Sequence, residues 1–253
     1  MHWPDFGPGF FALAIVAIMI TGISKGGFGS GIGGVAVPIL SLQIAPLQAA
    51  SIMLPILCLM DLVGLWAYRG KWSTAQIRLM VPGAMVGIAL GALAFGRLPA
   101  NSVRLLIGII AIGFTLNYWS GLSARLARTS RPPGRAQGVL WSGVSGFTST
   151  LAHAGGPPLA IYLLPQKLDR TLFVGTTVAF FTLVNYVKLV PYAWLGQFDA
   201  ANLSTSLVLL PLAPLGMALG IWLHRRISDR WFYRISYTAL FATGAKLVFD
   251  ALT

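Results

Sequence analysis

Six uninterrupted apolar stretches, each about as long as a membrane-crossing helix, dominate the chain. They cover residues 46–68, 78–97, 103–120, 171–196, 203–223 and 232–250. A helix needs about 20 mostly apolar residues to cross the hydrocarbon core of a bilayer. Charged residues make up only 9% of the 253 residues, and hydrophobic residues 56%, too few charges for an ordinary water-solvated surface. The chain is therefore predicted to be an all-α integral membrane protein.

Two further apolar stretches, residues 8–44 and 137–165, are interrupted by glycine. The first contains GGFGSGIGG (Gly26 to Gly34) and the second contains HAGGPP (His153 to Pro158). Because glycine and proline break regular helices, each stretch is predicted to form two short helices joined by irregular backbone. Together with the six simple stretches, this gives about eight hydrophobic segments.

The basic residues between the segments predict how the broken stretches sit in the membrane. If each broken stretch crossed once, seven basic residues would lie on one side and eight on the other. If each stretch instead returns as a hairpin to the side it entered, 13 lie inside and two outside, as the positive-inside rule requires. Two full crossings per stretch would give the same parity and remain an alternative. In either case the second half enters from the opposite side, so the halves are predicted to be inverted repeats.

An internal repeat supports two related halves. Residues 82–91 (PGAMVGIALG) match residues 211–220 (PLAPLGMALG), and residues 66–72 (WAYRGKW) match residues 192–198 (YAWLGQF). The glycine pair at residues 33–34 likewise matches the pair at residues 155–156. Three matches in the same order indicate duplication. The predicted organisation is an N-terminal membrane repeat over residues 1–122, a basic cytoplasmic linker over 123–136 and a C-terminal membrane repeat over 137–253.

Small and aromatic residues of the repeat receive a structural interpretation. Spaced glycines such as Gly87 with Gly91 let helix backbones approach closely. The aromatic pairs Trp66 with Tyr68 and Tyr192 with Trp194 lie at segment ends, where amphipathic rings prefer the lipid interface. Cys58 is expected to be a small buried apolar residue.

The glycine breaks are the candidate binding sites. Irregular backbone at membrane depth is tolerated only when it is packed in protein or lines a wet cavity. Proline is favoured at the first positions of a helix, so Pro157 and Pro158 predict that a half-helix starts there, and the helix after Gly33 and Gly34 is expected to start comparably. Two helix beginnings facing each other from opposite hairpins would form an anion site. The alternative is that these glycines only permit tight helix crossing.

Ionisable residues inside apolar segments are functional candidates because they are costly in hydrocarbon. Lys25 lies within the first glycine motif, and Lys188 follows Asn185 by three residues, so that both share one helical face. Asp61 is interpreted either as the partner of a lysine or as a proton-coupling group. Lys246 is expected to reach the outer surface.

Polar groups around the second break complete the candidates. His153 is expected to donate to an anion or to carry a proton. The hydroxyl residues there are either direct ligands or bonded to their own backbone; they are Thr148, Ser149, Thr150, Thr176 and Thr177. The scattered histidines suggest no metal cluster.

Three motifs carry a resemblance to a known family. Residues 22–38 read GISKGGFGSGIGGVAVP, residues 146–164 read GFTSTLAHAGGPPLAIYLL, and residues 175–192 read GTTVAFFTLVNYVKLVPY. In combination they resemble the TauE/SafE sulfite exporter family, also called the toluene sulfonate uptake permease family, along essentially the whole chain. The resemblance implies a multi-pass permease of the bacterial inner membrane, commonly an exporter, for sulfite, sulfonates or sulfoacetate.

The family motifs also imply which positions form the site. Carried onto this sequence they are Lys25, Gly26, Gly27, Gly33, Gly34, Gly155, Gly156, Pro157, Pro158, Asn185 and Lys188. The chain departs from the family pattern at Ser24, Thr150 and His153, where glycine or another small residue is common. These departures bear on the substrate more than on the fold, because the three positions flank the proposed site.

The predicted function is secondary transport of sulfite, an organosulfonate or a related small anion. An anion channel of the same architecture is the nearer alternative. A membrane-embedded enzyme is a more distant one, because the chain has no glutamate and a single cysteine, which leaves few groups for catalysis. The expected partners are the small anion and the bilayer, with a homodimer as a further hypothesis. Nucleic acid, a cofactor and a metal are not expected.

Overall fold

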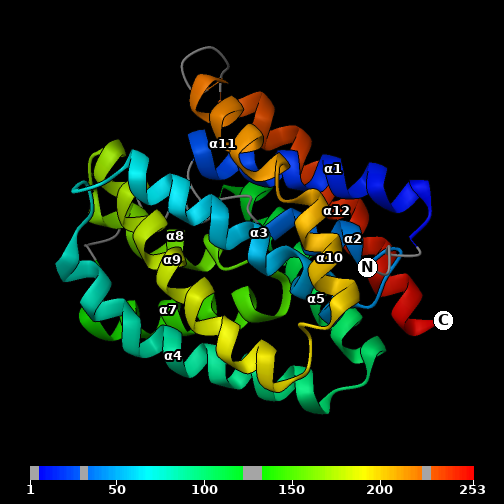
Figure 1. Cartoon of the computed structure of the whole chain (residues 1–253). Coiled ribbons are helices and arrows are strands. Elements are labelled where there is room, and N and C mark those ends of the chain that lie inside the picture. The colour runs from blue at the N-terminus through cyan, green and yellow to red at the C-terminus, as the bar shows by residue number, and fades with distance from the viewer. Residues whose placement is uncertain (1–5, 29–33, 122–132, 224–228) are drawn as a thin grey trace.

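The computed structural model describes residues 6–28, 34–121, 133–223 and 229–253, and the regular structure in these ranges is helical (Figure 1). The first half contains α1 (Pro8–Ile23), a π-helical turn η1 (Ser24–Phe28), α2 (Ala36–Leu40), α3 (Pro46–Ala67), α4 (Thr74–Arg97) and α5 (Ala100–Ser120). The second contains α7 (Arg135–Ala152), α8 (Gly156–Leu163), a 3₁₀ turn η3 (Leu164–Gln166), α9 (Arg170–Trp194), α10 (Ala200–Leu209), α11 (Leu212–Leu223) and α12 (Asp229–Leu252).

Six helical stretches in the described ranges are long and apolar enough to cross a membrane. They are Pro8–Gly27, Pro46–Ala67, Thr74–Arg97, Ala100–Ser120, Thr171–Trp194 and Ala200–Leu223. The last one is interrupted where α10 gives way to α11, at Leu210 and Pro211. The outward-facing side chains are apolar, with Val86 and Leu140 each 61% exposed, as expected for a surface that meets lipid. The chain is a multi-pass membrane protein.

Both broken stretches are interrupted where the sequence predicts, but their first arms are long. α1 continues through the π turn, so that Pro8–Gly27 is 20 residues long. α7 has 18 residues, whereas α2 has only five and α8 has eight. The prediction of two short helices per stretch is therefore wrong for the leading arms. The glycine pairs lie at or beyond the ends of these arms, and single glycines within the arms, such as Gly22 and Gly146, do not interrupt the helix.

Each broken stretch returns to the end of the bundle from which it started. A Cβ added to Gly9, at the start of α1, would lie 3.5 Å from the Gln43 side chain, just after α2. In the second half, the Gln166 amide donates to the Pro133 carbonyl at 3.2 Å, which joins the end of η3 to the start of α7. The two breaks meet inside the protein, because a Cβ on Gly34 would lie 2.5 Å from the Ala154 Cβ.

The spaced glycines of the repeat form close helix crossings, and these join the two halves. A Cβ on Gly87 of α4 would lie 1.9 Å from the Gly143 carbonyl oxygen of α7. A Cβ on Gly220 of α11 would lie 2.4 Å from the Ile23 carbonyl oxygen of α1. Figure 1 shows the α1–α11 and α4–α7 pairs on opposite sides of the bundle, with α3 between them. The packing role predicted for these glycines is confirmed.

The second pair of matched sequences gives similar turns but different aromatic environments. Gly70 and Gly196 occupy equivalent positions after α3 and α9, and both have a left-handed backbone, with φ of 72° and 67°. Trp66 and Trp194 are 75% and 86% exposed, as interfacial rings should be. Tyr192 is fully buried, and its hydroxyl donates to the Thr150 carbonyl at 2.6 Å. The interfacial prediction is therefore wrong for Tyr192, which the core accepts because its hydroxyl is paired.

Candidate functional site

The first lysine of the site pairs with Asp61, the only acidic residue in the part of the first half that the structure describes. The Lys25 ammonium, on the π turn, lies 2.5 Å from Asp61 Oδ1 of α3, and the two side chains are 8% and 0% exposed. Asp61 Oδ2 accepts from the Asn185 amide of α9 at 2.6 Å. Of the two interpretations of Asp61, the ion pair with a lysine is confirmed, and its role in proton coupling stays a prediction.

The second lysine is held by neutral acceptors. Lys188 is fully buried on α9, and its ammonium donates at 3.0 Å to both the carbonyl and the hydroxyl oxygens of Ser149. The third contact is to His153 Nδ1 at 2.7 Å. Three acceptors match the three N–H donors of an ammonium group. No carboxylate of the described residues forms a salt bridge with Lys188.

His153 is fixed in place from both sides of its ring. It ends α7 with a left-handed backbone, at φ 51°, a conformation that costs most residues energy and is often found at functional sites. Its Nε2 lies 2.9 Å from the Ala50 carbonyl oxygen of α3. A carbonyl can only accept, so Nε2 carries the hydrogen and Nδ1 is left to accept from Lys188.

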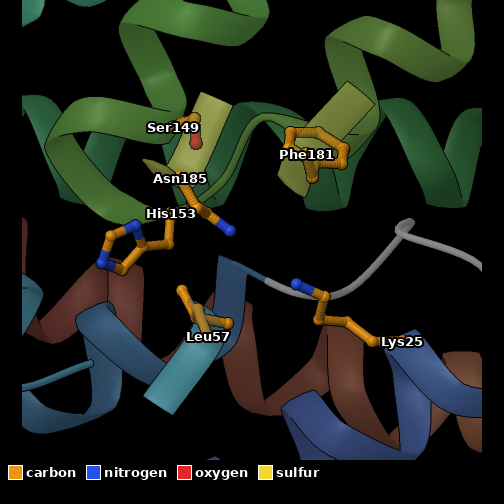
Figure 2. Close-up of a pocket in the computed structure, with 7 residues that line it drawn as sticks. Lys25, Leu57, Ser149, His153, Phe181 and Asn185 are labelled. Atoms are coloured by element: carbon orange, nitrogen blue, oxygen red, sulfur yellow. The ribbon is translucent and has the colours of Figure 1, made fainter. Parts of the chain in front are cut away.

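A small cavity lies between these two clusters. It has a volume of about 30 Å³ and is lined by Lys25, Leu57, Ser149, His153, Gly156, Phe181 and Asn185. Figure 2 shows Lys25 and Leu57 approaching from the first half, and the other labelled residues approaching from the second half. Asp61 and Lys188 lie behind this wall, each bonded to two of the lining residues. The cavity is therefore surrounded by two lysines and one aspartate.

The predicted glycine and proline residues have three different roles: some line the cavity, some pack against neighbouring helices, and some begin a helix. Gly156 lines the cavity, and Gly155 accepts from the Ser145 hydroxyl through its carbonyl at 2.7 Å. Gly26 packs closely on Met217 of α11, and Gly27 is buried. Gly34 contacts the second break, and Gly33 lies outside the described residues.

α8 begins at Gly156, as predicted from Pro157 and Pro158, both of which are buried. Proline has no N–H, so these two residues remove two of the donors that a helix beginning normally offers. α2 is only five residues long, which limits its dipole. The helix beginnings therefore supply fewer donors than the sequence prediction assumed, and the lysines carry most of the positive charge.

Of the two roles predicted for the hydroxyl residues near the second break, bonding to their own backbone is confirmed for three of them, and direct ligation stays a prediction. Thr148 and Thr150 donate to backbone carbonyls of their own helix at 2.9 Å, and Thr177 does the same at 2.7 Å. Thr176 accepts from the backbone N–H of Ser73 at 2.9 Å. Among these residues only Ser149 lines the cavity.

Other predicted residues lie away from the site or form its apolar wall. Lys246 is an exposed residue paired with Asp250, in agreement with its predicted surface position. Cys58 is buried and unbridged, as expected. Sequence reasoning did not identify Leu57 and Phe181, because one apolar residue in an apolar helix carries no signal that distinguishes it from its neighbours.

A multi-pass helical fold with two broken stretches meeting at a buried, positively charged cavity defines a class of membrane transporters. The chain belongs to the sulfite exporter TauE/SafE family, whose model matches residues 14–247. The resemblance inferred from the three motifs is thereby confirmed. Among curated proteins, the chain is similar to the "Probable sulfite/organosulfonate exporter TauE" of Cupriavidus necator, with 24% identity over 231 residues, which cover 89% of this chain and 88% of that protein. No solved structure matches the chain.

Proposed function

We propose that this chain is a secondary transporter that exports sulfite, an organosulfonate or a related small anion across the bacterial inner membrane. The observation that carries the proposal is that two buried lysines, Lys25 and Lys188, flank the cavity with a single carboxylate, Asp61, between them. A buried charge is costly unless it is paired. An anion in the cavity would supply the missing charge.

Donor groups around the cavity support the same proposal. Lys25 uses one N–H on Asp61, which leaves two for a ligand. The Ser149 oxygen accepts from Lys188, and its own O–H can turn toward the cavity. Gly156 is the first residue of α8, where the backbone N–H has no partner within the helix. Such donors are suited to the oxygen atoms of a sulfite or sulfonate group.

Contacts at the two ends of α3 support the proposal that the halves are inverted repeats of four segments each. At its first end, Gln48 donates to Asn202 at 3.1 Å, close to where the first hairpin opens. At its other end, Ser73 bonds to Thr176, and the second hairpin opens there. α3 is 22 residues long, or about 33 Å at 1.5 Å per residue. The hairpins would thus enter from opposite faces of the membrane.

The size of the cavity favours a carrier over a channel. A volume of about 30 Å³ holds on the order of two water molecules. Sulfite would need the lining side chains to move apart before it could bind. Such movement is expected of alternating access between inverted repeats, whereas an open channel would need a continuous polar path.

Purified protein in liposomes tests this function directly. We expect radiolabelled sulfite to cross these vesicles faster than empty ones, and excess unlabelled substrate to compete. The competitors are sulfite, sulfoacetate, taurine, sulfate and simple carboxylates, each with and without a pH gradient. Dependence on the gradient would identify proton coupling. The proposal fails if none of these anions moves although the protein is folded and inserted.

A further inference from the structure

Asn185 carries a buried acceptor that no described residue satisfies, next to a cavity lined by several donors. It is 2% exposed, lines the cavity and gives one N–H to Asp61 Oδ2. A carboxylate only accepts, so this contact fixes which end of the amide faces Asp61. The other end, Oδ1, is buried and has no hydrogen-bond partner among the described residues.

A buried acceptor without a partner is costly, because it has lost its bonds to water without replacing them. The cost is removed if the ligand brings a hydrogen-bond donor to Asn185. A fully deprotonated oxyanion such as sulfate has no donor, whereas an anion with an O–H or N–H has one. The side chain therefore favours a ligand that carries a donor.

The charge balance limits the ligand further. Three ionic side chains line the cavity or bond to its lining: Lys25, Lys188 and Asp61. The His153 ring accepts from Lys188 and is therefore counted as neutral. One negative charge compensates this set. A dianion would leave one negative charge unpaired in a low-dielectric site, which is unfavourable.

We infer that the preferred substrate is a monovalent oxyanion that also carries a hydrogen-bond donor. This inference rests on the proposed function and narrows its substrate class. Hydrogen sulfite meets both conditions and is small. Among sulfonates, a hydroxyalkyl sulfonate meets them, an alkyl sulfonate has the charge without the donor, and a carboxyalkyl sulfonate has too much charge.

Three sulfonates of similar size test the inference in liposomes, because their charges do not change near neutral pH. We expect isethionate to compete with labelled sulfite roughly two- to tenfold better than ethanesulfonate, the difference that one hydrogen bond makes. Sulfoacetate, a dianion, should compete less well than either. Equal competition by isethionate and ethanesulfonate would refute the donor requirement, and strong competition by sulfoacetate would refute the charge limit.

Variants assign the effect to Asn185. In Asn185→Leu, competition by isethionate should fall to the level of ethanesulfonate. Thr21→Val is the matched control, since Thr21 also has a buried oxygen that no described residue bonds but does not line the cavity; its preference for isethionate should be unchanged. If Asn185→Leu does not fold, Asn185→Ser and the wild-type competition still decide the question. If the wild-type protein does not transport sulfite at all, the proposed function itself is rejected.

Discussion

The two halves of the protein hold their buried lysines in opposite ways. In the first half, Lys25 projects from the glycine break and is paired with Asp61 on α3. In the second half the break supplies His153, and the lysine, Lys188, comes from α9 with only neutral acceptors. The comparison teaches that the excess positive charge of the site originates in the second half. The first half contributes a cation that already has its counter-ion.

The largest effect is expected when Lys25 is removed from its ion pair with Asp61. Lys25→Met leaves Asp61 buried with Asn185 as its remaining partner, so we expect the protein to lose about 3–5 kcal/mol of stability. The double variant Lys25→Met with Asp61→Leu should recover most of this loss, because no unpaired charge remains. Thermal unfolding in detergent measures both. No recovery in the double variant would show that Asp61 contributes more than a counter-ion.

Lys188→Met tests the second half, and its largest effect should be on transport. Removing the uncompensated charge should lower sulfite flux in liposomes roughly ten- to hundredfold, the value of a charged hydrogen bond. Lys246→Met is the control, because Lys246 is an exposed residue of α12, and its flux should match the wild type. Undiminished flux in Lys188→Met would place the binding charge elsewhere.

A third test compares a glycine at a helix crossing, Gly87 on α4, with a glycine that faces open space, Gly113 on α5. Gly87→Ala places a methyl group against the Gly143 carbonyl, and we expect a loss of about 1–3 kcal/mol from overpacking. Gly113→Ala on α5 adds a methyl where nothing lies within 4 Å, so stability should be unchanged or slightly higher. Unfolding temperatures in detergent compare the two, and equal values would contradict the close crossing.

The smallest expected effect separates two aromatic residues that the repeat makes equivalent. Tyr192→Phe removes the hydroxyl that donates to Thr150, which should cost about 1 kcal/mol. Trp66→Phe changes an exposed ring and should leave the unfolding temperature nearly the same. Similar shifts in unfolding temperature in both variants would mean that the buried Tyr192 contributes no more to stability than the exposed Trp66.

The sequence predicted the helical segments well because a long apolar run has few ways to satisfy its backbone in lipid. α3, α5 and α9 begin and end within about four residues of their predicted bounds. The interruption between α10 and α11 was missed, although Pro211 lies in it and Pro214 lies in the first turn of α11. Hydropathy averages over such a short break, so the segment reads as a single helix.

Several of the predicted site residues line one cavity, and their roles in binding stay predictions. Lys25, Ser149, His153 and Asn185 all line the cavity, because polar residues in apolar helices are conspicuous. The sequence could not predict which of these residues line the cavity and which lie behind the lining. Whether Lys188 faces the cavity or stands behind His153 depends on how α9 packs against α7, and the residue spacing does not encode that. The proline residues that mark the start of α8 also remove its N–H donors, a consequence that the helix-start signal hides.

The glycine crossings couple parts of the chain that are made at different times. α1 packs on α11 and α4 on α7, so each half presents bare backbone that only its counterpart can cover. A protein severed between α5 and α7 would yield two fragments that are incomplete alone. The two fragments should assemble only when both are synthesised into the same membrane. In the intact chain, α1 can pack against its partner helix only after translation has reached α11.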